Sequence, residues 1–199
     1  MARNGPALIL AVLAFGVASP APADPPAAQQ VSRLNGGWTL GDFALTDQQG
    51  RPFAREQLLG RWTLVLFGDT HCGEPCTAAL SALAAMCQRI ARTQKVKTTQ
   101  VVFVSLAGDT PEELRRYLAP FDEHFIGATG PPQRVKRLAD DLGVLDTLPE
   151  PSGQRVASAR PYPGLLSVVD PNGIVWGEFL PPYDVMMLTA RYLKARIGR

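Results

Sequence analysis

The most informative segment of this chain is Phe67-Gly68-Asp69-Thr70-His71-Cys72-Gly73-Glu74-Pro75-Cys76. It directly follows the apolar run Trp62–Phe67, which is typical of a strand buried on both faces. The residues after it, from about Cys76 to Arg92, repeat apolar side chains at helical spacing. The segment therefore lies where a buried strand ends and a helix begins. In open α/β sheets, this carboxyl end of a strand commonly holds the functional site.

Strand and helix patterns alternate over the rest of the chain. Asp170-Pro171-Asn172-Gly173 is a turn signal that joins the last two predicted strands in a hairpin. The order of elements predicts an α/β fold with a mixed sheet. A stretch without apolar period, Leu148–Pro161, is predicted to be a surface loop. The predicted strands are Asp42–Thr46, Trp62–Phe67, Val101–Leu106, Leu165–Val169 and Ile174–Phe179, and the further helices begin at Thr110, lie between Pro132 and Leu142, and span Asp184–Ile197.

The N-terminus has the pattern of an export signal. Arg3 supplies a positive charge, Ala7–Ala18 is an uncharged apolar core, and Ala21-Pro22-Ala23 fits a cleavage site. The apolar core is shorter than the roughly 20 residues that span a bilayer, which favours a cleaved signal over an uncleaved anchor. We predict a signal peptide over residues 1–23, a flexible lead-in over 24–37 and one domain over 38–199. The predicted location is the periplasm.

Composition narrows the class of protein. The chain has 199 residues, 46% of them hydrophobic and 19% charged, so it can bury a full core. The formal net charge is +2, and the basic residues are scattered, which argues against nucleic acid as a partner. Three cysteines are present, and in an oxidising compartment a close pair of them forms a disulfide unless it is kept reduced or metallated.

Cys72 and Cys76 form the candidate site. Their spacing corresponds to about one helical turn, roughly 6 Å between Cα atoms, which suits a disulfide or two thiolates on one soft ion such as Cu(I). We expect Cys72 to be the exposed and more acidic thiol, because helix amides favour negative charge, and Cys76 to be the buried partner. His71 could tune the thiol or serve as a spare ligand. A purely structural bridge is the alternative, but it would close a very short loop and stabilise little.

Two other residues with reactive side chains are predicted to be unremarkable. Cys87 falls at helical core spacing, and buried free cysteines are common, so we expect it to pack in the core. His124 has no neighbours at ligand spacing, and we expect it at the surface.

The motifs together resemble the SCO/SenC family, from about Gly41 to the C-terminus. The Thr-His-Cys-x-x-x-Cys element is the specific feature, since ordinary thioredoxins have two residues between the cysteines. The resemblance implies a thioredoxin-like three-layer fold with an extra hairpin. The segments that carry it are Gly41–Asp47, Phe67–Cys76, Val102–Ser105, Asp109–Glu112, Phe125–Gly130 and Val169–Gly173.

The resemblance also implies copper delivery to a respiratory oxidase, or reduction of the thiols of such a copper site. In the family, two cysteines and a distant histidine bind copper. The cysteines correspond to Cys72 and Cys76, but the histidine position is Tyr162 here. Two thiolates can still hold Cu(I), whereas Cu(II) loses its preferred imidazole. We also hypothesise that the Tyr162–Pro163 bond is cis and shields the thiol pair, as the cis-proline of thioredoxin-like reductases does.

Three functions follow from these residues. The first is an exported thiol–disulfide oxidoreductase acting on thiols of a metalloprotein such as an oxidase subunit, with Cys72 as nucleophile and Cys76 as resolving thiol. The second is a metallochaperone that holds Cu(I) between the same sulfurs for cytochrome oxidase assembly. The third is an interaction module that keeps the scaffold without the chemistry. Membrane association through the partner is compatible with each.

Overall fold

The computed structural model describes residues 1, 37–92, 99–144 and 165–197. The signal peptide after Met1, the lead-in to residue 36, the predicted loop Leu148–Pro161 and the Tyr162–Pro163 bond lie outside these ranges. The elements are β1 (Ala44–Asp47), β2 (Pro52–Ala54), the 3-10 helix η1 (Arg55–Leu58), β3 (Trp62–Gly68), α1 (Glu74–Ala91), β4 (Thr99–Ser105), α2 (Pro111–Leu118), β5 (Ile126–Thr129), α3 (Pro132–Asp141), β6 (Leu166–Val169), β7 (Val175–Phe179) and α4 (Val185–Ile197).

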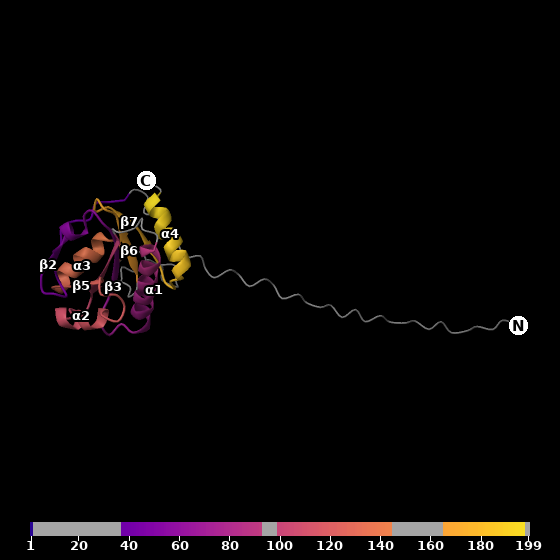
Figure 1. The fold of residues 1–199 in the computed structure, drawn as a ribbon, viewed down its shortest axis with the longest axis horizontal. Coiled ribbons are helices and arrows are strands. Elements are labelled where there is room, and N and C mark those ends of the chain that lie inside the picture. The colour runs from indigo at the N-terminus through magenta and orange to yellow at the C-terminus, as the bar shows by residue number, and fades with distance from the viewer. Residues whose placement is uncertain (2–36, 93–98, 145–164, 198–199) are drawn as a thin grey trace.

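The strands form one mixed sheet in the order β2-β1-β5-β4-β3-β6-β7 (Figure 1). The central strands β3, β4 and β5 are parallel, and antiparallel strands flank them on both sides. β3 lies between β4 and β6 and pairs along its whole length with β4, from Trp62 opposite Thr99 to Gly68 opposite Ser105. All seven residues of β3 are buried, which explains its continuous apolar run.

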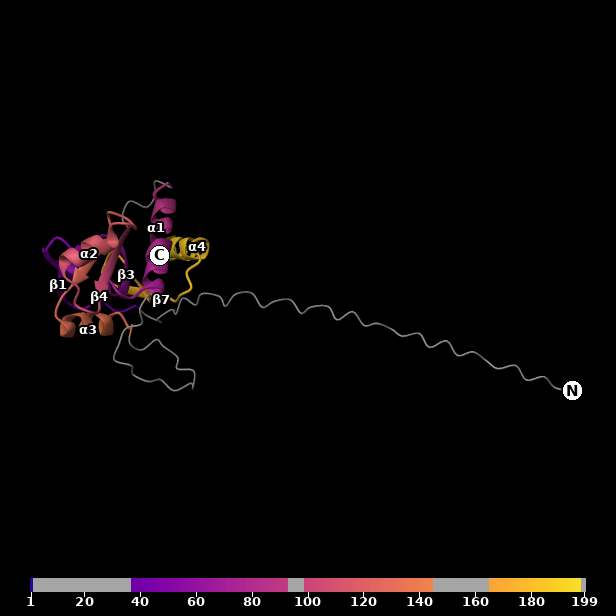
Figure 2. The same cartoon turned by 90° about the horizontal axis from the view of Figure 1, so that it is seen from below.

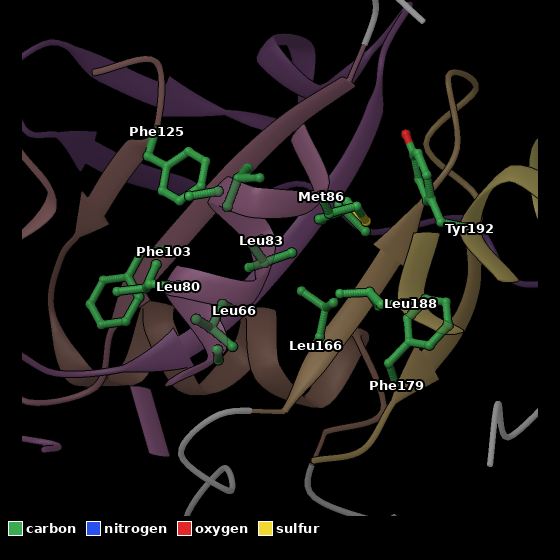
Figure 3. Close-up of a cluster of buried hydrophobic side chains, with 14 of the residues drawn as sticks. Leu66, Leu80, Leu83, Met86, Phe103, Phe125, Leu166, Phe179, Leu188 and Tyr192 are labelled. Carbon is green, nitrogen blue, oxygen red and sulfur yellow. The ribbon is translucent and has the colours of Figure 1, made fainter. Parts of the chain in front are cut away.

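Helices cover both faces of the sheet, as predicted for a three-layer α/β fold. On one face, α1, α2 and α4 bury their apolar side chains against the sheet, and α1 and α4 lie next to each other (Figures 1 and 2). Figure 3 shows Leu80 and Leu83 of α1 among the sheet residues Phe103 and Leu166. On the other face, a second cluster of buried apolar side chains contains residues of α3, of η1 and of the segment around Leu40 and Phe43. None of the helices in the described ranges has the length and apolar composition to cross a membrane.

A polar and aromatic cluster fixes α4 to the amino ends of the central strands. Tyr192 of α4 meets Trp62 edge-on, with ring centroids 6.1 Å apart, and its hydroxyl lies 2.6 Å from Thr99 Oγ1. Arg196 donates hydrogen bonds to both hydroxyl oxygens and stacks over the Trp62 ring. Because Trp62 and Thr99 open β3 and β4, this cluster lies at the end of the sheet opposite to the cysteine pair.

Two strands and the 3-10 helix were not predicted from the sequence. The more instructive of the strands is β5, in which two of the four residues, Gly127 and Ala128, have low strand preference. A Cβ at Gly127 would lie 2.9 Å from Leu118 Cδ1 and 3.0 Å from Leu114 Cβ, so the glycine allows α2 to approach the strand closely. The strand therefore exists because of its parallel pairing with β4 and the helix above it, rather than because of local propensity.

The predicted C-terminal hairpin is confirmed. Asp170 Oδ1 accepts hydrogen bonds from the backbone of Asn172 at 2.7 Å and of Ile174 at 3.1 Å, which closes the turn between β6 and β7. Gly173 in this turn has φ +76°, a conformation that favours glycine. β6 pairs antiparallel with β3, so the hairpin extends the sheet beyond β3 and β7 becomes its edge strand.

Candidate functional site

The cysteine pair lies at the carboxyl end of β3, as predicted, and is joined by a disulfide. The Cα atoms of Cys72 and Cys76 are 5.8 Å apart. The expectation that both cysteines lie on one helical turn is wrong, because α1 begins at Glu74 and leaves Cys72 outside it. Gly73, the N-cap residue, has φ +70° and bends the chain so that Cys72 folds back over the first turn.

The two sulfurs differ in exposure. Cys72 is half-buried, whereas Cys76 is completely buried within the first turn of α1. Gly68 makes room for the buried sulfur, since a Cβ at this position would lie 2.5 Å from Cys76 Sγ and 2.9 Å from the Phe103 ring. Cys72 is thus partly accessible to solvent, whereas Cys76 is held against the end of β3.

A buried carboxylate holds the loop that carries Cys72. Asp109 is 6% exposed and accepts hydrogen bonds from Thr70 Oγ1 at 2.6 Å, from the Thr70 backbone at 3.2 Å and from Ser105 Oγ at 2.6 Å. Thr70 follows β3, Ser105 ends β4, and Asp109 directly precedes the N-cap residue of α2. Three separate segments therefore converge on one carboxylate, next to His71 and Cys72.

His71 lies next to Cys72, but in the described ranges it forms no group of metal-binding side chains. Its side chain is exposed, and its Nδ1 lies 3.2 Å from Thr70 Oγ1. Its backbone donates to Asp69 Oδ1 at 2.7 Å, which helps to shape the turn. In the described ranges, no three His, Cys, Asp or Glu side chains are grouped as a metal site would require.

The two residues predicted to be unremarkable behave nearly as expected. His124 is exposed and pairs with Asp122 at 3.0 Å, so its surface position is confirmed. Cys87 lies at the edge of the core rather than fully inside it and is half-buried. Burial, with a smaller effect from the Asp122 carboxylate, raises the pKa of the Cys87 thiol to about 12, which favours the protonated, less nucleophilic form.

Sequence reasoning missed the residues that support the cysteine loop. Asp109 belongs to a segment that carried the family resemblance, which was the available signal, but its contact with Thr70 spans 39 positions. Tyr117 of α2 gave no signal beyond helical spacing. Its ring packs on Phe103, with centroids 5.5 Å apart, and Phe103 in turn borders the space next to Gly68 that Cys76 Sγ occupies.

The donor set at this site suits a soft monovalent cation. Opening the disulfide would leave two thiolates whose Cα atoms are 5.8 Å apart, an arrangement that two-coordinate Cu(I) accepts. Copper here would be cargo, and it would compete with the disulfide for the same sulfurs. The site therefore has two mutually exclusive forms, one oxidised and one with free thiolates.

A mixed sheet flanked by helices, with a disulfide where its central parallel strand meets a helix, defines a thioredoxin-like domain with a cysteine-pair site. The comparisons with known proteins agree. The family model described as SCO1/SenC matches residues 33–182, and the chain belongs to this family.

Individual relatives show how far the likeness extends. A protein of Stutzerimonas stutzeri named "Putative copper-binding protein" is 33% identical over 144 residues, which cover 72% of this chain and 70% of that protein. The crystal structure of Arabidopsis thaliana ScoI with copper bound is 27% identical, has a TM-score of 0.69, and matches 81% of this chain and all of that chain. The mitochondrial SCO2 protein of Saccharomyces cerevisiae is 34% identical over 111 residues, but this chain spans only 36% of its length.

Proposed function

We propose that this chain is an exported thiol–disulfide oxidoreductase that reduces the disulfide of a metalloprotein, such as the copper-site cysteines of a respiratory oxidase subunit. The Cys72 thiolate attacks one sulfur of the partner disulfide, and a mixed disulfide forms as the second partner thiolate leaves. The Cys76 thiolate then attacks Cys72 and releases the partner with two reduced thiols. Two electrons pass from the cysteine pair to the partner, and an exported dithiol reductant returns them to this chain.

The difference in exposure between the two sulfurs is the observation that supports this proposal. An attacking thiol must reach a sulfur on another protein, and the half-buried Cys72 can do so. A resolving thiol needs only to reach its neighbour, and the completely buried Cys76 lies one loop away, with 5.8 Å between the Cα atoms. A bridge of this span would constrain the unfolded chain little, which argues against a purely structural role.

Nearby charge favours the direction of electron flow. Asp69 flanks the loop and Asp109 lies beneath it, while in the described ranges no ion pair brings a Lys or Arg side chain to either carboxylate. Negative charge beside the pair disfavours thiolates and therefore stabilises the disulfide. A pair with a stable disulfide gives up electrons readily, so its reduced form is a reductant.

Trapping of the mixed disulfide tests this assignment. In the Cys76→Ser variant, Cys72 can still attack a partner disulfide, but no second thiol is present to release the partner. We therefore expect a stable mixed disulfide between Cys72 and a peptide that contains two cysteines joined by a disulfide. With Cys72→Ser, the buried Cys76 should give no adduct, and Cys87→Ser serves as the matched control with unchanged turnover. Equal trapping by both variants, or none by either, would refute the roles given to the two sulfurs.

A second candidate function is a Cu(I) chaperone, favoured by two sulfurs that lie together where the loop after β3 joins the first turn of α1. The reduced Cys72 and Cys76 would hold the ion, and no reaction step would be needed. The copper-bound ScoI structure supports this candidate by similarity. Anaerobic Cu(I) titration of the reduced wild type against the Cys72→Ser, Cys76→Ser double variant tests it. We expect one tightly held ion in the wild type and none in the double variant, and equal retention would eliminate this function.

Export and domain boundaries belong to the same proposal. We propose that residues 1–23 direct the chain to the periplasm and are removed, that 24–37 form a flexible lead-in, and that 38–199 form the domain. N-terminal sequencing of protein recovered from the periplasm should then begin at Asp24. A product that retains Met1 and sediments with membranes would instead indicate an anchor.

A further inference from the structure

The hydroxyl of Tyr117 is sealed from solvent beside the cysteine loop and meets no hydrogen-bond partner among the described residues. Its ring is fixed in place, because it packs between Phe103, at 5.5 Å between centroids, and Phe121, at 5.9 Å. A phenol that is buried without a partner costs free energy, and most buried tyrosines avoid this cost. Tyr192 is an example in the same protein, since its hydroxyl pairs with Thr99 at 2.6 Å.

The surroundings place this hydroxyl at the site. Phe103, on which the Tyr117 ring rests, also borders the space above Gly68 that Cys76 Sγ occupies. Cys72 and Tyr117 pack against the same core cluster. Burial raises the pKa of Tyr117, and the carboxylates of Asp69, in the cysteine loop, and of Asp109, which holds that loop, add to this effect.

The carboxylates of Asp69 and Asp109 already accept other hydrogen bonds in the disulfide form. Both oxygens of Asp109 accept hydrogen bonds from Thr70 and Ser105, and Asp69 Oδ1 accepts one from the His71 backbone. A disulfide sulfur is a weak acceptor, whereas a thiolate is a charged one that binds O–H donors strongly. At this end of the sheet, the group whose acceptor strength changes between the two redox states is the cysteine pair.

We propose that the Tyr117 hydroxyl is a hydrogen-bond donor held in reserve for the reduced state, in which it donates to the thiolate of Cys72. This inference rests on the proposed oxidoreductase function and names the group that stabilises its reactive form. The donor offsets the repulsion from Asp69 and Asp109, so that the pair can be reduced without losing the attacking thiolate. The phenol is thus unsatisfied in one redox state and satisfied in the other.

The test measures the redox equilibrium of Tyr117→Phe against glutathione, in a Cys87→Ser background that leaves only the pair. Phenylalanine keeps the ring contacts with Phe103 and Phe121 and removes the donor alone. We expect the equilibrium to shift about tenfold towards the disulfide, which is about 30 mV for a two-electron couple. The rate at which the reduced protein attacks a small disulfide should fall in parallel.

Tyr192→Phe is the matched control, because it removes a buried phenol at the opposite end of the sheet. It should lower stability in both redox states and leave the glutathione equilibrium unchanged. If Tyr117→Phe also leaves the equilibrium unchanged, or changes the stability of the oxidised and reduced forms equally, the proposal is overturned, and the phenol instead holds a permanent partner such as a buried water. If wild type has a measurable equilibrium but no activity on protein disulfides, the proposed function fails separately from this inference.

Discussion

Replacing Asp109 by asparagine tests how strongly the cysteine loop is held. The carboxylate accepts two hydroxyl hydrogen bonds of 2.6 Å and one backbone hydrogen bond of 3.2 Å, and it is 6% exposed. Asparagine has the same shape but only one acceptor oxygen. Its NH2 group therefore faces one of the two hydroxyls, which can no longer donate to this position. Hydrogen bonds to a charged group contribute about 1.5–3 kcal/mol, so we expect the free energy of unfolding to fall by about that amount.

Urea unfolding of the oxidised protein measures this loss, because the intact disulfide keeps redox changes out of the result. Asp140→Asn is the matched control, since Asp140 forms only an exposed ion pair with Lys136 and should change stability by less than about 0.5 kcal/mol. Thr70→Val completes a double-mutant cycle with Asp109→Asn, and their effects should be less than additive because they remove the same contact. Fully additive effects, or a loss no larger than that of the control, would refute the idea that Asp109 holds the loop.

Three further predictions concern single positions. Gly68→Ala should destabilise the protein by about 1–3 kcal/mol in thermal unfolding, since its new Cβ overlaps two fully buried groups; an unchanged Tm would contradict the packing described. Cys87, with a pKa of about 12, should resist alkylation at pH 8 in the folded, reduced protein and react only on unfolding, whereas rapid labelling would show that it is accessible. Burial tends to raise the pKa of Asp47, but hydrogen bonds from Arg51 and Gln49 outweigh it and hold this pKa below its ordinary value. The stabilisation is therefore present above about pH 4 and lost as the pH falls further, so acid unfolding of Asp47→Asn should depend less steeply on pH below this value than that of wild type.

The periodic parts of the sequence predicted the fold well, because burial imposes a repeat that can be counted. The buried strand β3, the helix α1 and the hairpin after Asp170 can each be predicted from local residues. β5 was missed, since Gly127 serves the approach of α2 and carries no strand preference of its own. Strands of this kind depend on partners that lie far away in the sequence.

The sequence predicts the two cysteines of the site but not the residues that surround and hold the cysteine loop. Cys72 and Cys76 can be recognised from their residue type and spacing. The distance between their Cα atoms agrees with the roughly 6 Å expected for one helical turn, even though Cys72 lies outside the helix. The Asp109 contacts and the position of Tyr117 arise only when β4 and α2 are placed beside the loop. A side chain that acts across such a separation leaves no pattern in any short window of sequence.

The late position of α4 in the chain has a consequence for biogenesis. Synthesis runs from the N-terminus, so both cysteines emerge well before Leu188 and Tyr192, which complete the core cluster over α1. For that interval, Cys87 lacks part of the core cluster against which it packs in the folded domain. The native pairing needs only the turn at Gly73 to bring its two ends together, so it can form before the domain is complete. Where the chain meets an oxidising environment, this proximity favours the Cys72–Cys76 pairing over pairings with Cys87, ahead of the tertiary structure that later buries Cys76.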